Sequence, residues 1–206
     1  MLLSIQAMWS AWVVRRTPGG DRWRATLWMW AFILLALSAG LGAIAHGVRL
    51  SPPLSELIWH PLYLGLGLVV VLIAVALVAD LWGERASRRA LPLFLGLGVV
   101  FYVVTLVAPP GFLVFIVYET VFMVFALGGY VYLTRKARPG AGWMAVGIVL
   151  TMVASAIQAT GRLSFTLIWP FDHNGIFHIV QMAGVAALVL GLRRLLRIPP
   201  AKGRSS

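Results

Sequence analysis

The chain has 206 residues, of which 61% are hydrophobic and only 11% are charged, and its formal net charge is +11. This composition excludes a soluble globular domain. The absence of cysteine excludes disulfides, cysteine-bound zinc and iron–sulfur clusters. The apolar residues come in runs of about twenty, the length that spans a bilayer as an α-helix. We therefore expect one all-α, polytopic membrane domain whose immediate partner is the lipid bilayer.

Taken in chain order, the apolar runs and the turn residues between them predict seven helices. Residues 2–14 are apolar over only about 20 Å as a helix, so the bundle has seven spans, or six if this segment lies at the interface. Segment 161–171 is too short and too aromatic for a span, and we expect an interfacial lid there. Residues 196–206 form a basic tail. The expected helices are 2–16, 23–46, 54–82, 90–108, 112–134, 142–160 and 172–195.

The basic residues are distributed very unequally between the two sides of this predicted bundle. One side receives only Arg49 and Arg162, whereas the other receives the arginines and lysines around 15–24, 85–89 and 135–138 and those of the C-terminal region. Short loops rich in Lys and Arg stay in the cytoplasm, so we expect a cytoplasmic C-terminus and an outside N-terminus. Membrane topology thus accounts for the positive charge without a nucleic-acid partner. Near the cytoplasmic side, Asp80 is expected to pair with Arg85.

The same orientation places all four histidines of the chain in the outer half of the bundle. His46 ends the second helix, His60 begins the third, and His173 and His178 begin the last. Other polar residues fall at similar depth in their helices, namely Glu119, Gln158, Gln181 and Ser38. Polar groups are costly in hydrocarbon unless they have a partner or a task, so we expect a common polar cavity.

Helical spacing indicates which of these side chains share a face. Asn174 and His178 are four residues apart, and His178 and Gln181 are three apart. His173 and His178 diverge by about 140° on an ideal helix and converge only if His173 sits in a non-helical cap. Three protein ligands and a water make a catalytic zinc site, for which Glu119 or Asp172 is a candidate ligand or proton acceptor.

Each of these residues also has a purely structural interpretation. Asp172 and Asn174 suit helix capping, whereas Gln158 and Gln181 suit hydrogen bonding between helices. His60 follows a tryptophan and suits the headgroup interface.

Two short stretches carry a resemblance to a known superfamily, Ala45-His46-Gly47 and the run from Asp172 to Gln181, DHNGIFHIVQ. With seven spans, they resemble the seven-helix membrane superfamily of alkaline ceramidases and adiponectin/progestin receptors, and more narrowly an uncharacterised bacterial branch. The resemblance implies a bacterial inner-membrane protein in which zinc is held by one histidine of the second helix and an HxxxH pair of the last. His46 matches the first position, and His178 matches the second member of the pair.

The match departs from the superfamily pattern at several positions. Asn174 stands where the first histidine of the pair is expected, with His173 offset by one. Gly42 stands where a serine is expected one turn before His46, and Ser38 lies a turn deeper. The third helix offers Glu56 and His60 in place of an aspartate.

The leading functional hypothesis is a zinc-dependent hydrolase that acts on a lipid amide or ester. Zinc would be held by His46, His178 and His173, with Glu119 or His60 as the third ligand if His173 points away. Glu119 would act as the acid–base group, with Asp172 and Ser38 beside it, and Asn174, Gln181 and Gln158 would orient the bound groups. Two alternatives remain open: a haem protein with histidine axial ligands, and a binding or transport protein without chemistry.

Overall fold

The computed structural model of the chain describes residues 1–18, 21–107, 113–161, 165–166, 170–171 and 173–197. Within them the structure has seven α-helices and one short antiparallel β-hairpin. The helices are α1 (Leu2–Arg16), α2 (Arg22–Gly47), α3 (Pro52–Trp82), α4 (Glu84–Val107), α5 (Leu113–Arg135), α6 (Ala141–Thr160) and α7 (His173–Leu196). The strands are β1 (Phe165–Thr166) and β2 (Pro170–Phe171).

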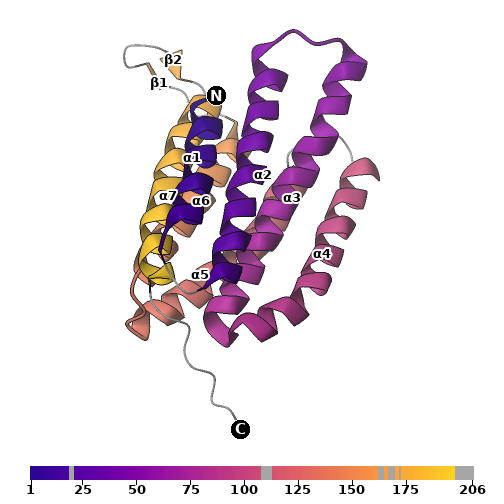
Figure 1. Cartoon of the computed structure of the whole chain (residues 1–206). Helices are drawn as coiled ribbons and strands as arrows, with labels where there is room; N and C mark the ends of the chain where they lie inside the picture. The colour runs from indigo at the N-terminus through magenta and orange to yellow at the C-terminus, as the bar shows by residue number, and fades with distance from the viewer. Residues whose placement is uncertain (19–20, 108–112, 162–164, 167–169, 172, 198–206) are drawn as a thin grey trace.

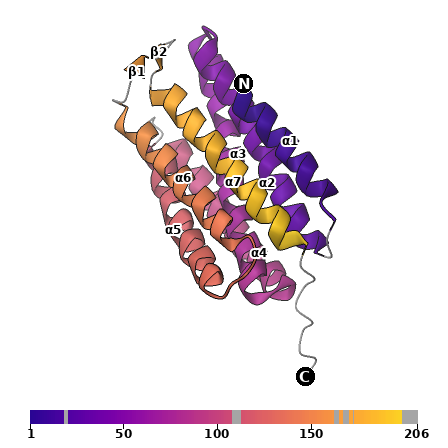
Figure 2. The ribbon, with the colours of Figure 1, turned by 90° about the vertical axis from the view of Figure 1, so that its left-hand side faces the viewer.

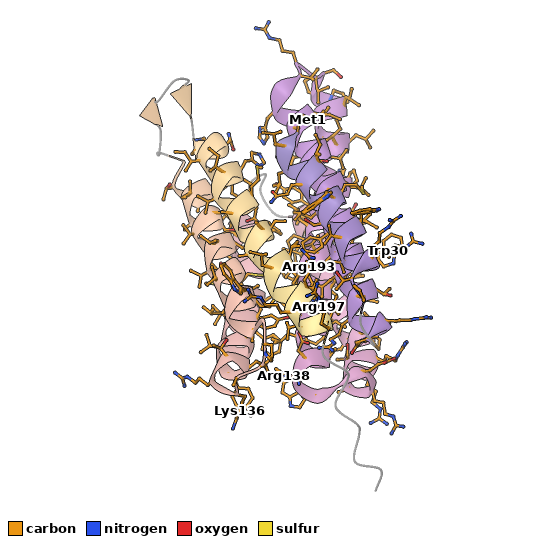
Figure 3. The ribbon with its side chains drawn as sticks, turned by 60° about the vertical axis from the view of Figure 1, so that its left-hand side comes forward. Met1, Trp30, Lys136, Arg138, Arg193 and Arg197 are labelled. Atoms are coloured by element: carbon orange, nitrogen blue, oxygen red, sulfur yellow. The ribbon has the colours of Figure 1, made fainter. Side chains whose placement is uncertain are left out.

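The helices from α2 to α7 are each long and apolar enough to cross a membrane. The remaining helix, α1, has 15 residues and is about 22 Å long. Many large apolar side chains point out of the bundle, among them Trp30, Val99 and Val121, which are at least half exposed. Figure 3 shows Trp30 on the outside of the molecule. An apolar exterior of this kind is what a hydrocarbon solvent favours.

Six of the helices form a ring, and α4 lies outside it (Figures 1 and 2). Around the ring, α1 packs against α2, α2 against α3, α3 against α5, α5 against α6, α6 against α7, and α7 against α1. Helix α4 packs mainly against the outer side of α3. The ring encloses the space in which the candidate site lies.

The two ends of the bundle differ in composition, and we name them for what they carry. The hairpin end holds residues 48–51 and the β-hairpin, and the basic end holds residues 83–89, residues 136–140 and the end of α7. Figure 3 shows Met1 toward the hairpin end and Lys136 and Arg138 at the basic end. The unequal distribution of basic residues expected from the sequence is thus seen in the folded chain.

Helices α6 and α7 approach each other closely because glycine stands at their contact. A Cβ atom added at Gly147 would lie 2.6 Å from Leu188 Cγ and 3.0 Å from the carbonyl oxygen of Gly184. An added side chain there would have to displace Leu188 and crowd the backbone of α7. The close approach allows polar side chains of the two helices to meet further along the same contact.

Helix α4 begins earlier than the expected bound at residue 90, which left residues 83–89 between two helices. Gly83, with a φ of +87°, makes the whole turn, and α4 begins at Glu84. The Arg88 side chain pairs with Glu84 at 2.7 Å, one helical turn away, which supports the helix from its first turn. Of the expected lid, the structure describes the paired strands β1 and β2.

A buried ion network near the basic end corrects the expected pairing of Asp80 with Arg85. The Arg24 guanidinium on α2 donates to Asp80 on α3 and to Asp21, both at 2.7 Å, and the Tyr130 hydroxyl on α5 donates to Asp80 at 3.0 Å. The side chains of Arg24 and Asp80 are 4% and 2% exposed. The turn at Gly83 leaves Arg85 exposed on α4, whereas Arg24 faces α3 directly.

Candidate functional site

A cavity of about 240 Å³ lies inside the ring of six helices. Residues of α1, α2, α3, α5, α6 and α7 line it, and no residue of α4 does so in the described part of the chain. The polar side chains on its wall are Ser38, His46, Glu119, Thr151, Ser155, Gln158, Asn174, His178 and Gln181. Helices widely separated in sequence therefore supply one common wall.

The polar side of the cavity is built on one face of α6. Thr151, Ser155 and Gln158 follow each other at spacings of four and three residues, so they point in one direction. The Gln158 amide donates from Nε2 to Asn174 Oδ1 at 2.8 Å, and the Gln181 amide donates from Nε2 to Thr151 Oγ1 at 3.3 Å. The side chains of α6 and α7 thus form a ladder of hydrogen bonds along the cavity.

Ser155, which lies between Thr151 and Gln158 on α6, binds a carboxyl group. Among the described residues this is the one carboxyl group on the cavity wall. The Ser155 hydroxyl donates to Glu119 Oε2, across the contact of α6 with α5. Glu119 as a whole is 8% exposed and Ser155 is 6% exposed. A buried carboxyl group needs such a partner, and Glu119 also lines the cavity.

The opposite wall of the cavity belongs to α2 and α3. Ser38, Gly42 and His46 follow at four-residue spacing on α2, and all three line the cavity. The His46 ring meets Trp59 of α3 edge-to-face, with the ring centres 5.6 Å apart. The Ser38 hydroxyl lies 3.5 Å from the carbonyl oxygen of Leu62. Aromatic packing therefore fixes the imidazole at the hairpin end of the cavity.

Polarity changes along the length of the cavity. The polar residues lie in the half nearer the hairpin end. His46 and Gln158 are in the last turns of α2 and α6, which end there, and Asn174 is in the first turn of α7, which begins there. The half nearer the basic end is lined by apolar side chains, among them Trp28, Phe32, Ile73, Met123, Ile148 and Leu188. The cavity is therefore amphipathic, like a lipid with one polar end.

Most of the site residues expected from the sequence lie on this cavity wall. His46, His178, Glu119, Ser38, Asn174, Gln158 and Gln181 all line it. Two further expected residues, His60 and His173, do not, and Asp172 lies outside the described residues. Because α7 is helical from His173 onward, His173 has no cap geometry that would turn it toward His178.

Thr151 and Ser155 are polar residues of the cavity wall that were not expected from the sequence. Their spacing with Gln158 on one apolar helix was the available signal. Within the described residues, no three His, Asp or Glu side chains come together as a group that could hold a metal ion. Two imidazoles, those of His46 and His178, thus line the same cavity, and the described residues form no complete zinc site.

Comparison with known proteins gives a family but no characterised relative. No curated protein and no solved structure matches the chain. One family model matches residues 1–197, which is nearly the whole sequence. The chain therefore belongs to the family of unknown function DUF6962.

Proposed function

We propose that the protein is a seven-span integral protein of the bacterial inner membrane, with its basic end and C-terminus in the cytoplasm and its N-terminus outside. Six helices of sufficient length and apolarity support the membrane placement. The cationic side chains gathered at the basic end support the orientation, because such loops remain cytoplasmic. Helix α1 is counted as a span because it closes the ring between α2 and α7.

Single-cysteine labelling tests this topology cleanly, because the native chain has no cysteine. Ser51→Cys, exposed at the hairpin end, should react with a membrane-impermeant maleimide in intact cells. Lys136→Cys, exposed at the basic end, should react only after permeabilisation. Reaction of Lys136→Cys in intact cells would reverse the orientation.

The cavity binds an amphipathic, single-chain lipid whose polar group lies among the polar side chains near the hairpin end. The observation that carries this assignment is the change from polar to apolar walls along one cavity. Its volume of about 240 Å³ is near the lower end of small-molecule sites, which hold roughly 300–1,000 Å³. This is room for one short chain and not for a two-chain phospholipid.

The lining also selects the chemistry of the polar group. No lysine or arginine is found among the described residues of the wall, so an anionic head would lack a permanent counter-charge. Amide, hydroxyl and carboxyl groups are instead arranged to exchange hydrogen bonds with a neutral head. A neutral amide or ester of a short fatty acid fits both halves.

A blocking substitution tests this binding function. Gly42 lines the cavity, and a Cβ there meets only Leu62 Cδ1, at 3.7 Å, so Gly42→Leu extends into open space. In lipid discs, its affinity for radiolabelled N-octanoylethanolamine should fall at least about tenfold. The matched control is Gly96→Leu on α4, where nothing lies within 4 Å of an added Cβ. Equal affinity of the native protein and Gly42→Leu would contradict binding in this cavity.

A second candidate function is hydrolysis of the bound amide or ester. The specific observation in its favour is that Glu119, hydrogen-bonded to Ser155, shares the cavity with the imidazoles of His46 and His178. A carboxylate in this position can accept a proton from water or from a hydroxyl. The superfamily resemblance implies zinc, but no three His, Asp or Glu side chains of the described residues come together to hold it, so no step here is assigned to a metal.

A further inference from the structure

Helices α1 and α7 run side by side in the same direction, and one hydrogen bond sets their register. The Gln6 amide donates from Nε2 to the carbonyl oxygen of Met182 at 2.9 Å. From these two residues, Arg16 lies ten positions further along α1 and Arg193 eleven positions further along α7. At a rise of about 1.5 Å per residue, these separations correspond to about 15 Å along α1 and about 16.5 Å along α7. The two arginines therefore reach the basic end at the same level.

The arginines lie on neighbouring sides of the contact between the two helices. Arg16 lies about 80° around α1 from Gln6, at the outer surface. Arg193 is about three helical turns beyond Met182, so it lies on the side of α7 that contacts α1, and Arg197 follows one turn later. Figure 3 shows Arg193 on the lower half of α7 and Arg197 just past its end, beside α1. The Arg16 guanidinium lies 4.7 Å from the ring centre of Trp12, which holds it at the outer surface. All three arginines are exposed.

We name Trp12, Arg16, Arg193 and Arg197 the arginine seam. Within the described residues, ion pairs join Arg24 to Asp21 and Asp80, and Arg88 to Glu84, and none involves the arginine seam. Among the described residues, these three cations thus have no carboxylate partner. They are exposed and can bind an anion from outside the chain.

A shallow, open groove runs along α1 above the arginine seam. It is lined by Ser4, Ile5, Met8, Trp9 and Trp12. Arg16 follows Trp12 by one helical turn, so the groove ends at the cation. An apolar groove that ends at a cationic group at the level of the basic end has the chemistry of an acyl chain joined to a phosphate.

We propose that the arginine seam binds an anionic phospholipid of the cytoplasmic leaflet, with its phosphate between Arg16 and Arg193 and an acyl chain along the α1 groove. This site lies on the outside of the bundle and is separate from the internal cavity. It rests on the proposed membrane orientation, which places the basic end in the cytoplasmic leaflet. Clustered Lys and Arg beside a span are the groups that attract anionic headgroups.

The test compares thermal unfolding of the purified full-length protein in neutral detergent with added phosphatidylglycerol or phosphatidylcholine. The midpoint should rise by about 3 °C with phosphatidylglycerol and not with phosphatidylcholine. Arg16→Gln/Arg193→Gln should lose most of this rise, and Arg16→Lys/Arg193→Lys should keep at least half of it. The lysine variant shows whether the seam tolerates substitution when its charge is kept.

The matched control is Arg85→Gln/Arg89→Gln, which removes two exposed arginines at the basic end but away from the arginine seam. It should keep the full rise. Equal losses in the seam and control variants would show a general effect of surface charge and overturn the proposal, as would equal rises with both lipids. Labelling of Lys136→Cys from outside would instead refute the orientation, so the two failures are distinguishable.

Discussion

Replacing Asp80 with alanine should lower the free energy of unfolding by about 3–5 kcal/mol, which is the usual cost of removing one partner of a buried ion pair. Arg24 would keep only Asp21, and the Tyr130 hydroxyl would lose its acceptor. Both groups are shielded from water, so solvent cannot replace the lost interactions. The change should appear in equilibrium unfolding of the purified protein in mixed micelles.

The matched control breaks an exposed pair at the same end of the bundle. In Glu84→Ala the Arg88 side chain loses its ion-pair partner. The side chains of Arg88 and Glu84 are 55% and 49% exposed, respectively. Such pairs contribute about 0–1 kcal/mol. A similar loss for Asp80→Ala and Glu84→Ala would contradict the role given to the buried network.

A triple replacement tests whether the cost of Asp80→Ala comes from leaving a buried charge without its partner. Arg24→Met, Asp80→Leu and Tyr130→Phe together remove all three hydrogen-bonding groups and leave apolar side chains of similar size. Such replacements are often neutral or stabilising, and the Asp21 carboxylate that remains keeps its hydrogen bond from the backbone N–H of residue 24. We expect the triple variant to regain most of the stability that Asp80→Ala loses.

Helix positions and the one-sided placement of the histidines could be read from the sequence, because both depend on order along the chain. Runs of apolar residues define the spans, and counting spans places His46 and His178 at one end. That both line one cavity also depends on how α2 and α7 are rotated about their axes. The close approach of α6 and α7 at Gly147 helps to set the rotation of α7.

Side-chain partners between helices could not be predicted in the same way. Asp80 lies five positions from Arg85 and 56 from Arg24, yet it binds Arg24. The choice depends on how α2 and α3 are rotated and packed, which local spacing does not encode. Thr151 and Ser155 were missed for a related reason, since hydroxyl groups in apolar helices often bond their own backbone and carry no signal of a shared site.

Replacing Glu119 and Ser155 together should abolish most lipid binding while leaving the fold intact. In Glu119→Leu/Ser155→Ala both partners of the buried hydrogen bond are removed, so no polar group is left unsatisfied. The free energy of unfolding should therefore change by less than about 1 kcal/mol. The affinity for N-octanoylethanolamine should fall at least about tenfold, because the polar head loses its acceptor. Native affinity in this variant would refute the assignment of the head group to this end of the cavity.

Glu119→Gln then distinguishes binding from hydrolysis. The glutamine keeps an oxygen that accepts from Ser155, so affinity for N-octanoylethanolamine should change by less than about threefold. It can no longer take up a proton, and a general base contributes about 10²–10⁴-fold to a reaction rate. Release of octanoate should therefore fall at least about 100-fold if Glu119 is the acid–base group. An unchanged rate of octanoate release in Glu119→Gln would exclude that role, and binding without any release by the native protein would leave the cavity as a lipid-binding site.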